Sequence, residues 1–95
     1  MNILEHMMAL YDEVLEELMD AEKYAKCLEK ATSTEDKSMY RGLAKQELEH
    51  GAMLERAGDK LFSGVGQGDP MLMVWHRLKD HTHRWKARIE ARLSE

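Results

Sequence analysis

The stretch ATSTEDK, residues 31–37, decides how this chain folds, because it contains both a helix stop and a helix start. Thr32 with Glu35, or Ser33 with Asp36, has the spacing of a capping box, in which a hydroxyl group and a carboxyl group satisfy the first turn of a helix. The acidic pair also complements the positive end of the helix dipole. So short a connection forces the helices on its two sides into an antiparallel hairpin.

Apolar residues on both sides of this turn recur in steps of three and four, which is the period of an amphipathic helix. The first helix is predicted from about residue 2 to residue 31 and the second to about residue 62. The apolar positions of the first are Leu4, Met7, Tyr11, Val14, Leu18, Ala21, Ala25 and Leu28. Those of the second are Met39, Leu43, Leu54, Ala57 and Leu61. No segment alternates as a strand does.

A glycine-rich loop is predicted over residues 63–69, and a third helix over residues 70–95. Asp69 suits the N-cap of that helix and Pro70 its first position. Its apolar positions are Met71, Trp75, Leu78, Trp85, Ile89 and Leu93. The sequence therefore predicts one all-α domain, in which the third helix follows a hairpin of residues 1–62 and packs on it or on a neighbouring subunit.

Composition excludes several classes of protein. The 95 residues include 43% hydrophobic ones and carry a net charge of −4, with no basic excess to bind nucleic acid. No apolar run approaches the ~20 residues that span a bilayer, and the first residues lack the pattern of a signal peptide. One cysteine, Cys27, provides no intrachain disulfide. We therefore expect a cytoplasmic protein without membrane or nucleic-acid partners, and its small size favours oligomerisation.

Three polar residues fall inside the predicted apolar stripes. On a helical wheel Glu22 lies about 40° from Leu18, while Glu47 and His50 lie about 40° and 20° from Leu43. If the hairpin turns near Ser33, Glu22 lies eleven residues before the turn and Glu47 fourteen after it, so their levels differ by roughly one helical turn or less. The remaining acidic residues of this region are predicted on the flanks or the outer face, where water solvates them: Glu13, Glu16, Glu17 and Asp20.

Buried carboxylates that face each other require neutralisation, since burying even one costs several kcal/mol. A shared proton, a salt bridge to Lys26 or a divalent cation would each serve, and the cation also uses the imidazole of His50. The Glu47-x-x-His50 spacing places both side chains on one helix face. The alternative is a hydrogen-bonded pair of Glu22 and His50, with Glu47 at a dimer rim.

The segment DAEKYAKCLEKATSTEDKSMYRGLAKQELEHGAMLERAGDKL, residues 20–61, resembles one half of a rubrerythrin or ferritin-like domain, and is most similar to the encapsulated-ferritin group. The resemblance implies Glu22, Glu47 and His50 as metal ligands. It implies a homodimer that forms a ferritin-like four-helix bundle around a di-iron centre shared by two subunits, with manganese as the other metal. Oxidation of Fe(II) is the implied activity, and an encapsulating shell the implied partner, although the C-terminal ARIEARLSE does not resemble a targeting tail.

A rival interpretation is a non-catalytic helical assembly or adaptor protein, in which the buried glutamates and histidine are structural. The third helix adds three histidines to the choice between them. His76 and His83 share a face with Asp80, where a solvated polar surface is expected rather than a metal site. His81 is predicted beside the apolar stripe.

Overall fold

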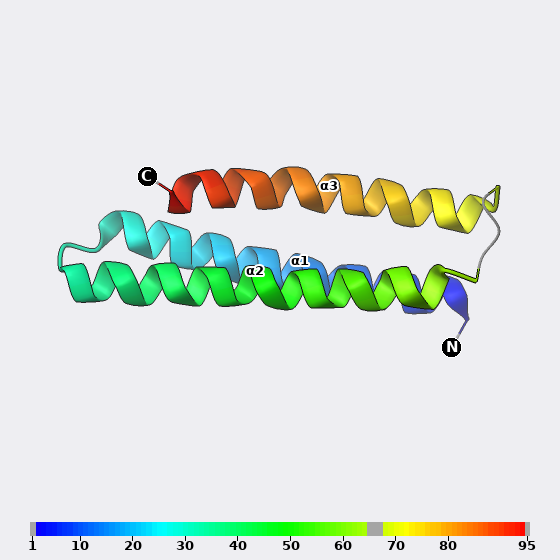
Figure 1. Cartoon of the computed structure of the whole chain (residues 1–95), viewed down its shortest axis with the longest axis horizontal. Helices are drawn as coiled ribbons and strands as arrows, with labels where there is room; N and C mark the ends of the chain where they lie inside the picture. Colours follow the sequence, from blue (N-terminus) through cyan, green and yellow to red (C-terminus); the bar gives the residue numbers. More distant parts are fainter. Residues whose placement is uncertain (1, 65–67, 95) are drawn as a thin grey trace.

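The computed structural model describes residues 2–64 and 68–94, and every regular element among them is an α-helix. In chain order these are α1 (Ile3–Lys30), α2 (Thr34–Phe62) and α3 (Pro70–Leu93). They run along one long axis in a molecule of 51 × 22 × 15 Å (Figure 1). The prediction of an all-α chain with a hairpin and a third helix is confirmed. Residues 65–67 of the expected loop lie outside the described part.

The predicted N-caps of α2 and α3 both form hydrogen bonds to the first turn of their helices. The Ser33 hydroxyl accepts from the Asp36 backbone N–H at 3.0 Å, so Ser33 rather than Thr32 is the N-cap of α2. Asp69 accepts from the Met71 N–H at 2.8 Å, and Pro70 occupies the first turn of α3. Between α1 and α2 the chain is extended at Ala31. These local bonds fix where each helix begins.

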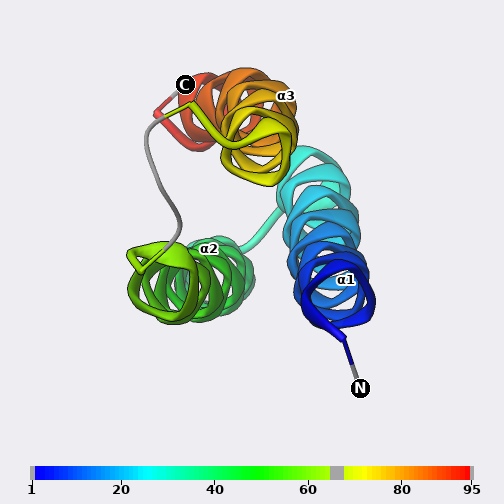
Figure 2. The same ribbon diagram turned by 90° about the vertical axis from the view of Figure 1, so that its right-hand side faces the viewer.

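The buried stripe of α1 faces both other helices. It consists of Met7, Val14, Leu18, Ala21, Ala25 and Leu28. Along most of its length it packs against Ala44 and Leu48 of α2 and against Ile89 and Leu93 of α3. Viewed along the bundle, the three helices stand at the corners of a triangle (Figure 2). The core therefore lies between three helices, and α1 contributes most of it.

A second buried cluster closes the end of the bundle away from the α1–α2 turn. Trp75 of α3 meets Phe62 of α2 edge to face, with ring centroids 5.1 Å apart. Gly58 makes this contact possible, because a Cβ there would stand 2.5 Å from Trp75 Cη2. The Trp75 indole N–H donates to Asp59 at 2.8 Å. Trp75 and Ile89 are buried as predicted, while Leu78 and Trp85 are half-buried.

The predicted rotation of α2 is partly wrong. Met39 and Leu61 were expected in the core but remain 49% and 46% exposed, whereas Ala44 and Leu48 are buried. The reason is that α3 docks beside α2, so the buried face of α2 turns toward the seam of all three helices. In α1, Leu4 is likewise exposed. None of the described helices has the length and apolarity that a transmembrane span requires.

Candidate metal centre

Glu17 of α1 and the pair Glu47 and His50 of α2 bring two carboxylates and an imidazole together. One ligand atom from each lies within 4.8 Å of the others. His50 Nδ1 is 3.7 Å from Glu17 Oε2 and 3.9 Å from Glu47 Oε2. The Glu-x-x-His spacing sets the α2 pair on one face. The buried Gly51 of α2 lies beside Glu17, since a Cβ at Gly51 would stand 3.7 Å from Glu17 Cβ, in ordinary van der Waals contact.

The structure does not bring Glu22 to this cluster. The Glu22 carboxylate lies on the opposite flank of the α1 stripe, where it accepts a hydrogen bond from the Trp85 indole N–H of α3. Its other oxygen is 3.6 Å from Lys26 Nζ, the salt bridge considered above. The Glu22 carboxylate thus has a hydrogen bond from α3 and an ion pair within α1. Of the three residues expected at one site, only Glu47 and His50 lie together.

Glu17 lies on a flank of the buried α1 stripe, but the prediction that water solvates its carboxyl group there is wrong. Its side chain is 26% exposed, and its Oε2 atom is buried with no hydrogen-bond partner among the described residues. Counting residues from the turn would have identified Glu17 as the partner of His50, because Glu17 is 16 residues before Ser33 and His50 is 17 after it. Glu22 is only 11 residues before the same point. Equal distance from the turn is therefore the signal that identifies Glu17.

The electrostatics of the site disfavour an ionised Glu17. The pKa of Glu17 is raised from 4.5 to about 7, first by a hydrogen bond to the Glu47 carboxyl group, which needs a proton on one of the two, and next by burial and by the negative charge of Glu47. The charge of His50 opposes this shift. With the proton removed, two carboxylates repel each other across the helix seam. Such a site holds either a proton or another positive charge.

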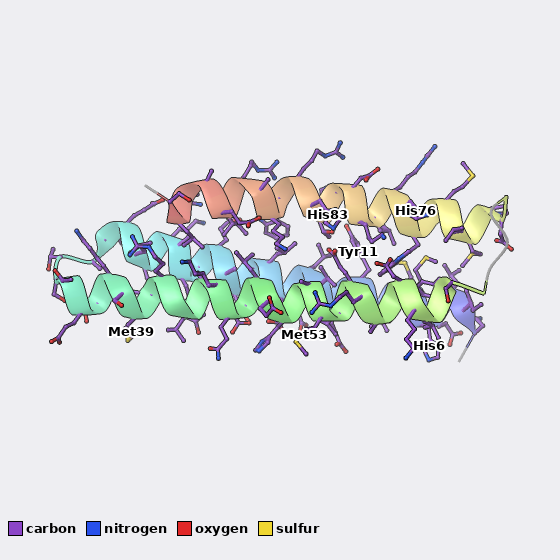
Figure 3. All side chains as sticks on the ribbon, viewed as in Figure 1. His6, Tyr11, Met39, Met53, His76 and His83 are labelled. Atoms are coloured by element: carbon purple, nitrogen blue, oxygen red, sulfur yellow. The ribbon has the colours of Figure 1, made fainter. Side chains whose placement is uncertain are left out.

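The cluster opens to solvent on the side of the hairpin that α3 does not cover. An open pocket of about 350 Å³ is lined by Glu13, Glu17, His50, Met53 and Leu54. Met39, Met53 and His6 project from the hairpin on the side away from α3 (Figure 3). His50 itself is half exposed. An ion from solution can therefore reach Glu17 and His50, which line this pocket, without a change in the fold.

The histidines of α3 do not form a second cluster. His83 Nε2 lies 2.6 Å from Glu55 Oε2, so α2 occupies its ring nitrogen. His76 and His81 are exposed, and His81 does not reach the core. Within residues 2–64 and 68–94, Glu17, Glu47 and His50 form the only group of three suitably placed ligands.

No protein-family model matches this chain, and neither the curated proteins nor the solved structures contain a match to it. The class that fold and site define is thus a three-helix protein with a candidate carboxylate and histidine cluster. The ferritin-like relationship stays a prediction that depends on the residues of the hairpin alone.

Proposed function

We propose that this protein binds a first-row divalent metal ion, iron foremost and manganese second, through Glu17, Glu47 and His50. The observation that carries the proposal is the buried Glu17 Oε2, which lies 3.7 Å from His50 Nδ1 and accepts no hydrogen bond from any residue in 2–64 or 68–94 when both carboxyl groups are ionised. Buried polar atoms without partners are rare, so each calls for an explanation such as an ion. Carboxylate and imidazole ligands suit iron and manganese. Glu17 takes the position that the family resemblance gave to Glu22.

A second copy of the chain would complete the site. One chain offers two carboxylates and one imidazole, which are too few ligands for two ions. On α2, Met39, His50 and Leu61 are spaced eleven residues apart, so they share one face, and both apolar members are about half exposed. A two-fold axis through this face would cover the apolar side chains and double the ligands to four glutamates and two histidines. That set is typical of di-iron four-helix bundles.

Bound iron would supply one-electron chemistry between Fe(II) and Fe(III), with dioxygen or peroxide as the oxidant, which is the ferroxidase activity expected from the resemblance. The ligand residues of the chain balance the positive charge of the metal ion. Ionised Glu17 and Glu47 neutralise a divalent ion, and neutral His50 adds a ligand without further charge. Because metal ligands must be deprotonated, Glu17 with a pKa of about 7 has to release its proton on binding. Metal affinity should therefore rise with pH up to about neutrality.

The experiment compares two glutamates of one helix. Protein purified without chelators from iron-supplemented cells should contain about one iron per chain, as a di-iron site shared by two subunits requires. Glu17→Gln, Glu47→Gln and His50→Ala should lose it, while Glu22→Gln should keep it. Glu49→Gln is a further control, since Glu49 is exposed and pairs with Arg56. Mass in solution and the rate of Fe(II) oxidation are measured on the same samples.

Each outcome separates the candidates. If Glu22→Gln loses iron and Glu17→Gln keeps it, the ligand set inferred from the resemblance replaces the one proposed here. If every variant and the wild type lack metal, the site is structural, and the chain is better described as a helical assembly or adaptor protein. If iron is bound by a monomer, the shared di-iron centre is refuted while the metal site stands.

A further inference from the structure

A second concavity lies on the other flank of α1, between that helix and α3. Its volume is about 440 Å³, which falls within the usual range for small-molecule sites. The lining residues are Met19, Glu22, Lys23, Lys26, Cys27 and Lys30 of α1 and Trp85 of α3. Apart from Glu22, none of these was considered as a ligand residue above. The pocket shares no residue with the cluster of Glu17, Glu47 and His50.

The rim of this pocket is positively charged. Lys23, Lys26 and Lys30 follow one another at steps of three and four, so their side chains leave α1 on one face. Lys26 is paired with Glu22 at 3.6 Å. Lys23 and Lys30 are exposed and form no ion pair with any residue in 2–64 or 68–94. Two ammonium groups are therefore available to a negatively charged ligand.

The other wall of the pocket is the indole ring of Trp85. Its N–H is already donated to Glu22, and this bond holds the half-buried ring in place at the pocket. What Trp85 offers a ligand is therefore ring surface rather than a hydrogen bond. Met19 and Cys27 belong to the same lining, and sulfur-containing side chains pack well on aromatic rings. A flat aromatic group fits such a wall better than a flexible aliphatic one.

We propose that this pocket binds a small aromatic anion, a planar ring that carries a carboxylate, sulfonate or phosphate group. The ring lies against Trp85, and the anionic group lies among the ammonium groups of Lys23, Lys26 and Lys30. The proposal is independent of the metal site, because α1 presents the two sites on opposite flanks.

Naphthalenesulfonate is the probe, followed by proton–nitrogen correlation spectra of the full chain. The two indole N–H signals serve as reporter and internal control, since Trp85 lines the pocket while Trp75 is 2% exposed and bonded to Asp59. The Trp85 signal should shift saturably and the Trp75 signal should stay in place. Lys23→Gln with Lys30→Gln should weaken binding roughly three- to tenfold, as expected for the loss of two exposed charge contacts. Added salt should weaken it in the same direction.

A control pair removes the same charge elsewhere. Lys60→Gln with Arg77→Gln should bind the probe as the wild type does, because both residues are exposed and lie outside the lining. Neutral naphthylmethanol and aliphatic cyclohexanesulfonate should each bind at least several-fold more weakly. Equal binding of either compound would overturn the proposal, as would equal weakening by the two variant pairs. Binding that Glu17→Gln leaves unchanged supports it whatever the metal content proves to be.

Discussion

Replacing Glu17 with glutamine should stabilise the metal-free protein at about pH 8 and leave its stability nearly unchanged at about pH 4. The pKa of the Glu17 carboxyl is raised from 4.5 to about 7 in the folded chain, first by the hydrogen bond to Glu47 and next by burial. The folded state therefore holds this proton more tightly than the unfolded state does. The stability that the Glu17 proton contributes is fully present below pH 4.5 and is lost as pH rises toward 7. Glutamine has nearly the same shape as glutamate and does not ionise, so the variant does not lose this stability as pH rises.

The size of the effect follows from the shift. One pKa unit corresponds to about 1.4 kcal/mol, so the rise from 4.5 to about 7 corresponds to about 3.5 kcal/mol. Solvent screens the side chain, which is 26% exposed, so the ionised carboxylate should destabilise the fold by about 2–3 kcal/mol above neutral pH. In a chain of this length, that free energy should raise the unfolding midpoint by about 10–20 °C. Thermal unfolding is followed by circular dichroism with a chelator present, at both pH values. The control is Glu22→Gln, which replaces a carboxylate that already has a hydrogen bond and an ion pair, and should not stabilise at either pH.

A variant that is equally destabilised at both pH values would refute the reasoning, because the contribution of Glu17 to stability would then not depend on its ionisation. Adding Fe(II) or Mn(II) should reverse the order of stabilities. A metal that binds only the folded wild type adds its binding free energy to that state, and the glutamine variant lacks the ligand. Higher stability with lost binding is the usual relation at functional sites.

Two further predictions concern packing and the histidines of α3. Gly58→Ala should lower the free energy of unfolding by about 1–3 kcal/mol, because its Cβ would collide with the Trp75 ring. Gly42→Ala should raise that free energy by up to about 1 kcal/mol, because nothing lies within 4 Å of a Cβ at this position. Both changes are measured by denaturant unfolding. The double variant His76→Ala with His83→Ala should keep the metal content of the wild type. A loss of half or more of the metal would place the site on α3.

The fold could be predicted because its decisive signals are local. The cap at Ser33 and the start at Asp69–Pro70 are hydrogen bonds and backbone restrictions within three residues, and the sequence displays them directly. The rotation of α2 is different. Periodicity showed that α2 has an apolar face, but Met39 and Leu61 extend that face beyond what one chain buries. Which part is covered depends on where α3 docks, and that contact involves residues far apart in the sequence.

Two of the three residues of the candidate site could be predicted for the same reason. Glu47 and His50 are three residues apart on one helix, so their proximity follows from helix geometry. The third member depends on how α1 lies against α2. Glu17 and Glu22 are five residues apart and therefore about 140° apart on the wheel, one on each flank of the buried stripe. A wheel of α1 alone does not tell which flank meets α2, because the position of α3 decides it.

These two glutamates also show how a structural residue differs from a candidate functional one in the same helix. On the flank that meets α3, Glu22 receives a hydrogen bond and an ion pair, so nothing more is needed there. On the flank that meets α2, ionised Glu17 has a buried oxygen that accepts no hydrogen bond from the described residues, and a second carboxyl group lies beside it. The fold tolerates that cost because the core around α1 is otherwise well packed. A cation at this seam would remove the penalty, and if two chains share the cation, its binding free energy becomes free energy of assembly. The oligomer should then fall apart when a chelator removes the metal, and it should do so more readily below the pKa of Glu17 than above it.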